Sequence, residues 1–364
     1  MHLSTTKTID STVMPGIAFN ALFQTTKDVQ AAKAINYRAA IQSKADELLQ
    51  QGIEQHQASL FRWALKNWQL ALKLYRELDN RLGEGRVFGN LGLVYNSLGQ
   101  YQRAIECYQQ SLVIIREVGD PTREGRILGN LGNAYLNLGQ HEQAIDYYKL
   151  RLIMVCAIGD RAEHGKALGN LGNAYFNLGQ YDRAHEVYEQ RLAITRDIDD
   201  LQGESNTLGN LGNVYLTLEQ PQRAIELYEQ QLVIAREIDD RQGESNALGN
   251  LGVVYRHLEQ YEQAVELYEE RLALSREIGD RRGEENTLRN LGLLFKVQEQ
   301  PELAIVFLTQ AVRVQEEIRQ EFTDQVLLRS YTEKVSGTYH ALADVLFEQG
   351  HIVKAQQVLT LLKG

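Results

Sequence analysis

The sequence predicts an all-α fold, a solenoid of antiparallel helix pairs, and three observations support this prediction. Apolar residues recur three and four positions apart, which places them on one face of a helix. Only 4 prolines interrupt the 364 residues, so long helices are allowed. A segment related to Leu-Gly-Asn-Leu-Gly-Asn recurs every 40 residues, and such self-similarity is typical of stacked repeats. Its copies begin at Phe88, Leu128, Leu168, Leu208, Leu248 and Leu288.

Residues 121–160 show how one unit is expected to fold. Leu128, Leu131 and Tyr135 lie at spacings of three and four residues, which indicates a first helix. Gly139 ends this pattern, and a second run with the same spacing follows it. Each helix should therefore contain about 17 residues and be roughly 25 Å long.

The residues at the expected helix ends and crossings support this pairing. Asp120 before Pro121 is a favoured helix start, because aspartate accepts hydrogen bonds from unpaired amides and proline has no amide hydrogen. Gly132 costs about 1 kcal/mol of helix propensity relative to alanine, so we expect it where two helices cross closely. Tyr148 is expected to fill the pocket between one unit and the next.

The repeat period divides the chain into three regions. Seven 40-residue units in phase fill residues 41–320. Residues 1–40 are predicted to be an N-terminal tail, partly disordered (residues 4–12) or with one extra helix. After residue 320 the phase shifts by 11 residues, so 321–364 is predicted to be an irregular C-terminal helical pair that caps the array.

Composition and motifs argue against catalysis and against several kinds of partner. With 38 basic and 48 acidic residues the formal charge is −10, the wrong sign for a protein that binds the nucleic-acid backbone. No apolar run approaches the ~20 residues that span a bilayer, so we expect a soluble, cytoplasmic protein without membrane contact. The sequence lacks a phosphate-binding loop, a nucleophile elbow and a paired-histidine zinc helix. We therefore expect no catalytic residue, no metal and no cofactor.

The internal order of each unit resembles the tetratricopeptide repeat (TPR). Residues 171–175 have the pattern Leu-Gly-x-x-Tyr, and residues 179–188 have Gly-x-Tyr-x-x-Ala-x-x-x-Tyr, in a unit lengthened from the usual ~34 residues. The lengthened unit also looks like the arrays of the LGN/Pins polarity scaffolds and of kinesin light chains. The resemblance implies a right-handed superhelix whose first helices line a concave groove. WD40 repeats are excluded because they need four strands per unit, and the pattern distinguishes the chain from HEAT and armadillo repeats.

The C-terminal region resembles a particular junction between domains. Residues 310–319, 346–350 and 355–359 are similar to the join between TPR repeats and the caspase-like CHAT domain of bacterial, particularly cyanobacterial, proteins. In that family the protease-like domain would start after Gly364. This resemblance keeps open the alternative that the chain is the regulatory half of a CHAT protease system that lacks its catalytic domain.

A stripe of asparagines is the candidate binding site. Asn130, Asn133 and Asn137 lie at i, i+3 and i+7 on one face of a predicted first helix, and the matching positions of TPR proteins line the groove. An amide both donates and accepts, so a ladder of amides can pair with the backbone of an extended peptide. The alternative is that the amides bridge neighbouring first helices, above all in the row that contains Asn130. The predicted site comprises Asn130, Asn133, Asn137, Asn170, Asn173, Asn177, Asn210 and Asn213, together with Arg86, Arg126 and Lys166.

The three cations of this site lie one turn before the asparagines in the same stripe. They are predicted to hold a carboxylate or an acidic segment, because a guanidinium can pair with a carboxylate through two hydrogen bonds. The alternative is a solvated charge, or a salt bridge to the nearby Glu84 or Glu124. Recognition of a chaperone C-terminus is not expected, because the lysine of that TPR clamp is replaced by Gly89, Gly129 and Gly169.

Together these observations predict a non-catalytic scaffold or sensor that binds an extended segment of a partner in its groove. The partner is expected to be a protein or peptide and not a nucleic acid. A third alternative, besides the CHAT-linked one, is a homotypic assembly module in which the helices of residues 321–364 stack on a second copy.

Overall fold

A computed structural model describes residues 14–320 and 325–362 of the chain. Every regular element in these residues is an α-helix, which confirms the predicted all-α fold. Residues 4–12, predicted to be disordered, lie outside the described part. The helices are α1 (Met14–Gln57), α2 (Phe61–Glu77), α3 (Arg81–Ser97), α4 (Tyr101–Val118), α5 (Pro121–Asn137), α6 (His141–Ile158), α7 (Arg161–Asn177), α8 (Tyr181–Asp197), α9 (Leu201–Thr217), α10 (Pro221–Glu237), α11 (Arg241–His257), α12 (Tyr261–Glu277), α13 (Arg281–Val297), α14 (Pro301–Gln320), α15 (Gln325–Glu348) and α16 (Ile352–Leu361).

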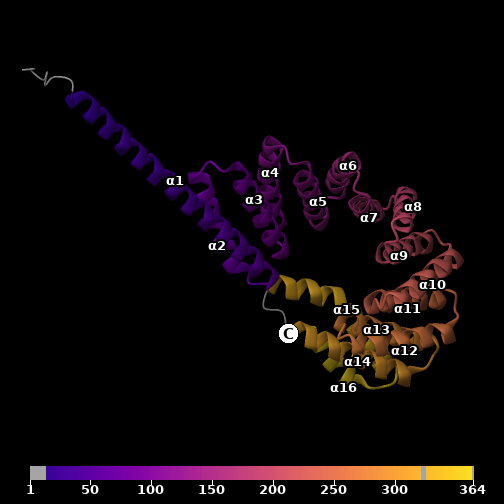
Figure 1. Ribbon diagram of the computed structural model, residues 1–364. Helices are drawn as coiled ribbons and strands as arrows, with labels where there is room; N and C mark the ends of the chain where they lie inside the picture. Colours follow the sequence, from indigo (N-terminus) through magenta and orange to yellow (C-terminus); the bar gives the residue numbers. More distant parts are fainter. Residues whose placement is uncertain (1–13, 321–324, 363–364) are drawn as a thin grey trace, which may run out of the picture. The chain divides into compact units, whose positions relative to one another are not determined.

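The helices pack as consecutive pairs within two compact units, residues 1–158 and 159–364. In the first unit α3 packs on α4 and α5 on α6, and in the second unit α7 packs on α8 and α9 on α10 (Figure 1). Successive first helices of the pairs, such as α7 and α9, also approach each other. Among the described residues the second helices, such as α8 and α10, make no such contact. The first helices therefore form one wall of each unit, and the second helices form the other.

The helix ends follow the residues that predicted them. Asp120 is the N-cap of α5 and accepts a hydrogen bond from the amide of Arg123 at 2.9 Å, while Pro121 is the first helical residue. The same bond caps α9, α11 and α13 at 2.9 Å. Gly139 follows α5 with a φ of 78°, a left-handed conformation that glycine adopts without strain. The predicted start and end of this helix are confirmed.

The core of each unit lies between its helices. Leu128 and Leu131 of α5 and Ala144 and Tyr148 of α6 are all buried, as their spacing predicted. A Cβ atom on Gly132 would lie 2.4 Å from Cε1 of Tyr148, so this close crossing needs glycine. The ring therefore covers a glycine of its own 40-residue unit, a contact that the sequence prediction did not include.

The two ends of the array depart from the regular pairs. α1 continues through residue 40 without a break, so no helix end marks that predicted boundary, and it packs on α2. At the other end α14, α15 and α16 pack in sequence order. The buried Gln315 of α14 donates to Glu285 of α13 at 2.8 Å and to Thr338 of α15 at 3.0 Å. This polar junction fixes α15 where the 40-residue phase is lost.

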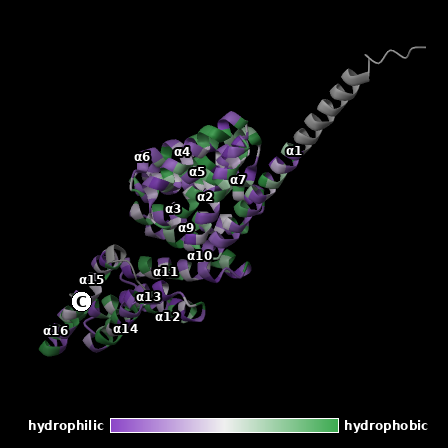
Figure 2. Cartoon of the chain, turned by 90° about the vertical axis from the view of Figure 1, so that its left-hand side faces the viewer, coloured by the Kyte–Doolittle hydropathy of each residue, from purple (hydrophilic) through white to green (hydrophobic). Residues whose placement is uncertain are grey.

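Polar residues run along all of these helices. Figure 2 shows hydrophilic and hydrophobic residues mixed along the labelled helices. No helix in the described part of the chain is long and apolar enough to cross a membrane.

Candidate functional site

The predicted asparagines lie on the first helices, where their exposure differs by row. Asn133 and Asn173 are exposed and Asn213 is half-buried. Asn130, Asn170 and Asn210, one turn earlier in each helix, are half-buried, whereas Asn137 and Asn177 near the helix ends are exposed. These equivalent repeat positions, Asn133 in the first unit and Asn173 and Asn213 in the second, are called the amide row below. Its members come from α5, α7 and α9, one from each helix.

A tyrosine of the following second helix holds each amide of this row. The hydroxyl of Tyr148 donates to Oδ1 of Asn133 at 2.6 Å, and Tyr188 donates to Asn173 at 2.6 Å. Tyr228 donates to Asn213 at 2.7 Å. Burial raises the pKa of all three hydroxyls, so they remain protonated donors at neutral pH.

This bond fixes which end of the amide is available to a ligand. Because Oδ1 accepts the tyrosine proton, the donor group Nδ2 is the free end of each side chain. Among the described residues no hydrogen bond leaves Nδ2 of Asn133, Asn173 or Asn213. The result is a repeated, pre-oriented N–H donor. The asparagine stripe alone did not predict these tyrosines as part of the site, although their constant 15-residue separation from the asparagines could have indicated the pairing.

Some asparagines also bridge successive first helices, as the alternative interpretation proposed. Nδ2 of Asn210 lies 3.4 Å from Oδ1 of Asn173, and Nδ2 of Asn137 lies 3.4 Å from Oδ1 of Asn96. Both bonds are long, since N–H···O bonds typically measure about 2.9–3.0 Å. Bridging therefore accounts for Asn210 and Asn137 in part, and it does not involve the Nδ2 groups of the amide row.

The three predicted cations differ in their partners. Lys166 pairs with Glu163 of its own helix at 2.9 Å. Arg86 and Arg126 are exposed, and no carboxylate of the described chain lies within ion-pair distance of either. The expected partners of these two arginines are paired elsewhere: Glu84 with Arg76 and Arg81, and Glu124 with Arg116 at 2.7 Å. A salt bridge thus explains Lys166 only, and through a different carboxylate.

Carboxylates are concentrated at one end of the first helices. In α3, α5, α7, α9 and α11 every Asp or Glu lies within the first four residues. These carboxylates are paired with basic side chains, for example Glu204 with Arg196 and Glu244 with Arg236, both at 2.7 Å. Beyond the first four residues these helices carry no acidic side chain, although the whole chain has a net charge of −10. The first-helix wall of each unit is therefore suited to a neutral or acidic ligand.

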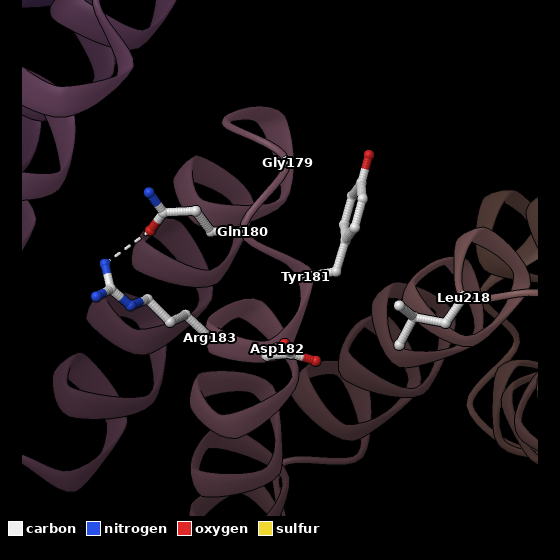
Figure 3. Close-up of a pocket in the computed structure, with 6 residues that line it drawn as sticks. All are labelled: Gly179, Gln180, Tyr181, Asp182, Arg183 and Leu218. Carbon is white, nitrogen blue, oxygen red and sulfur yellow. Dashed lines mark hydrogen bonds between the residues drawn. The ribbon is translucent and has the colours of Figure 1, made fainter.

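A surface hollow of about 410 Å³ lies elsewhere, at the turn between α7 and α8. Figure 3 shows Gln180 and Arg183 on one side of this turn, with Tyr181 and Leu218 on the other. Arg183 donates to Gln180 at 2.8 Å. The same bond, also at 2.8 Å, joins Arg103 to Gln100 two 40-residue repeats earlier. Because the bond recurs, we interpret it as a structural hydrogen bond that stabilises the turn. We therefore do not assign a ligand to the hollow.

The described residues contain no cluster of three or more histidine, cysteine or acidic side chains that could hold a metal ion. The two cysteines form no disulfide.

Tandem helix pairs with glycine crossings and a shared amide row define a helical-repeat protein. A family profile described as the tetratricopeptide repeat matches residues 83–152, 203–277 and 243–317, and a second profile of the same description matches 167–202. The chain therefore belongs to the tetratricopeptide repeat family, and the predicted solenoid of TPR units is confirmed. A search of curated proteins by sequence finds no match.

Solved structures with a similar fold include bacterial regulators. The apo form of the quorum sensor NprR from B. thuringiensis is 17% identical, with a TM-score of 0.65, over 94% of this chain and 95% of that one. The apo form of RapI is 15% identical with a TM-score of 0.62, over 76% of this chain and 99% of that one. A Rap protein complexed with Competence and Sporulation Factor is 15% identical with a TM-score of 0.53, over 77% of each chain. At these identities the likeness concerns the fold.

Proposed function

We propose that the chain is a non-catalytic interaction protein, a scaffold or sensor, whose first-helix wall binds an extended segment of a partner protein. The observation that carries the proposal is the amide row, in which a buried tyrosine orients each asparagine so that Nδ2 is available. An N–H donor repeated at one position per unit suits main-chain carbonyl oxygens, because every residue of a segment presents one. Such a wall binds a backbone largely independently of its sequence.

The orientation of the amides favours binding in a second way. A free asparagine side chain loses rotational freedom when it binds, and this ordering costs affinity. Here the tyrosine bond has ordered the side chain already. Pre-organisation of this kind strengthens binding without adding contacts.

The charge of the wall supports a neutral or acidic segment. In the first unit Arg86 and Arg126 are exposed and have no ion-pair partner in the described chain. Both can pair with a carboxylate through two hydrogen bonds. The structural neighbours give independent support for a ligand-dependent regulator, since one is named as a quorum sensor and another is complexed with Competence and Sporulation Factor.

Alanine substitution of the whole amide row tests the proposal. Asn133→Ala, Asn173→Ala and Asn213→Ala together should abolish partner capture in affinity purification with mass spectrometry. The circular dichroism spectrum should remain that of a folded helical chain, although each substitution removes a tyrosine hydrogen bond that contributes about 1 kcal/mol to stability. A matched control is Asn246→Ala, which removes an exposed first-helix asparagine outside the row. Unchanged capture by the folded triple variant would refute the proposal.

Self-association is a second candidate, favoured by the exposed apolar residues of the last helix. Ile352 and Val353 at the start of α16 are 55% and 67% exposed. Such residues can cover one another when two copies meet. Light scattering over a range of concentrations should then show a mass that rises with concentration, and a constant monomer mass would exclude this candidate. The CHAT-linked alternative stays a prediction, and the reading frame downstream of the gene tests it.

A further inference from the structure

Three second helices place an arginine against a glycine of the first helix beside it: Arg151 over Gly129 in the first unit, and Arg191 over Gly169 and Arg271 over Gly249 in the second unit. In the second unit a Cβ atom on Gly169 of α7 would lie 2.5 Å from Nη1 of Arg191, and one on Gly249 of α11 would lie 2.5 Å from Nη1 of Arg271. In both cases the nearest atoms belong to the guanidinium and not to the stem. Each glycine therefore leaves a slot, and the charged end of an arginine fills it.

The direction of these side chains follows from the tyrosine in the same unit. Tyr188 passes over Gly172 and ends at Asn173 of the amide row. Arg191 lies one turn after Tyr188 on α8, and Gly169 lies one turn before Gly172 on α7. Because the helices are antiparallel, the arginine crosses α7 alongside the tyrosine. Its guanidinium thus reaches the first-helix wall beside the amide row.

Neither guanidinium has a hydrogen-bond or ion-pair partner among the described residues, and Nε of each is buried. Asp200 and Asp280 lie close enough to act on Arg191 and Arg271 electrostatically. Both carboxylates instead accept the N-cap hydrogen bonds of α9 and α13 at 2.9 Å. Burial lowers the pKa of both arginines. A half-buried cation without a bonded partner is costly, and a ligand carboxylate would relieve that cost.

The other units show that the arginine is not required for packing. Over Gly209 the slot is filled by Gln231, whose Oε1 lies 2.7 Å from the position of an added Cβ atom. Over Gly89 the nearest atom is Cδ1 of Ile127 at 3.1 Å, and the hydroxyl of Ser111 lies at 3.4 Å. A neutral side chain thus satisfies the same geometry. The charge in the two arginine slots of the second unit therefore calls for an explanation other than packing.

We infer that Arg191 and Arg271 are binding residues that receive two carboxylate side chains of the extended segment on the first-helix wall. This inference rests on the proposed function and adds the chemical class of the ligand, an acidic peptide. The amide row binds the main chain of the peptide, while the two arginines bind its acidic side chains. The slot that contains Gln231 lies between the two arginine slots in repeat order. Because Gln231 is neutral, we expect little preference for a particular peptide side chain at that position.

The repeat spacing sets the distance between the two carboxylates. Packed helices lie about 8–10 Å apart, so slots two units apart are separated by roughly 20 Å. An extended chain covers about 3.3–3.6 Å per residue. The two acidic residues are therefore expected about six positions apart.

The test selects peptides from a displayed library of random sequences of about twelve residues, long enough to span both slots. The full chain is compared with the variant Arg191→Gln/Arg271→Gln, which introduces the residue that the slot over Gly209 already contains. The wild-type pool should be enriched in acidic pairs about six positions apart. The variant pool should lose this enrichment and still contain binders held by the amide row. A selected acidic peptide should bind the variant about tenfold more weakly or worse.

The outcomes separate this inference from the proposed function. Equal acidic content in the two pools, with binding that still needs the asparagines, would overturn the arginine assignment alone. A library without binders, or binders that ignore the triple asparagine substitution, would overturn the proposed function and this inference with it. A third variant, Gln231→Arg, tests for a gained preference, and its result does not depend on whether Arg191→Gln/Arg271→Gln is stable. It should add a preference for a third acidic residue between the other two, and an unchanged preference would contradict the inference.

Discussion

Two glycines of the same helix should respond oppositely to alanine. Gly125 and Gly132 are both buried in α5. An alanine Cβ atom at position 132 would lie 2.4 Å from Tyr148, a distance that requires the ring to move. At position 125 the nearest atoms, on Met154 and Val155, lie at 3.9 and 4.0 Å, which is ordinary contact. The two sites therefore differ in packing, while the change in helix propensity is the same.

The magnitudes follow from these contacts. Replacing glycine by alanine inside a helix stabilises it by about 0.5–1 kcal/mol. Gly125→Ala should gain that amount. Gly132→Ala adds an overpacking cost of about 1–3 kcal/mol and the loss of the Tyr148 hydrogen bond to Asn133, about 1 kcal/mol. The net destabilisation of Gly132→Ala should be about 1–3 kcal/mol, after the propensity gain is subtracted.

Urea unfolding followed by circular dichroism measures both changes. The midpoint should rise for Gly125→Ala and fall for Gly132→Ala relative to the unsubstituted chain. Because each unit of a repeat protein contacts only its neighbours, both effects should be confined to the transition that includes α5. A shift of the same sign in the two variants would refute the assignment of Gly132 to a crossing that excludes a methyl group.

Three further predictions concern single contacts. Tyr188→Phe removes the hydrogen bond that orients the amide of Asn173, so it should lower the free energy of unfolding by about 1 kcal/mol. It should also weaken peptide binding measured by fluorescence anisotropy, and an unchanged affinity would contradict the orienting role of Tyr188. Asp200→Ala removes the N-cap bond of α9 and should cost about 1 kcal/mol in thermal unfolding, whereas an unchanged melting temperature would show that the cap is dispensable. Burial raises the pKa of Cys107 to about 11, so its thiolate is scarce at pH 8. Mass spectrometry after iodoacetamide treatment at this pH should therefore find the exposed Cys156 alkylated before Cys107. The reverse order would contradict the burial of Cys107.

The sequence predicted the repeat architecture because its signals are local and repeated. The 40-residue period, the N-cap at Asp120 and the glycine that ends α5 each depend on neighbouring residues, and the structure confirms them. Stacking a predicted pair on an identical neighbour then needs no further information. The N-terminal boundary at residue 40 stays a prediction, since α1 runs through it without a helix end.

The site was predicted only in part, because its chemistry depends on contacts between helices. The asparagine positions follow from helical spacing, but the bond from Tyr148 to Asn133 depends on how α6 crosses α5. The arginine over Gly169 depends on the same crossing between α8 and α7. The sequence also does not show which of two nearby arginines forms an ion pair with Glu124. Arg126 is close to Glu124 in sequence, but Arg116 of the preceding helix forms the ion pair. Spacing identifies which residues share a face and does not identify which of them bond.

The central claim is that the amide row binds the backbone of a partner. The crystal structure of the chain with a segment selected by affinity measures this most directly. The Nδ2 atoms of Asn173 and Asn213, which both belong to the second unit, should lie within about 3 Å of main-chain carbonyl oxygens of the segment, while the tyrosine bonds to Oδ1 persist. A segment bound to the second helices, or held by side chains with the amide row unoccupied, would contradict the claim.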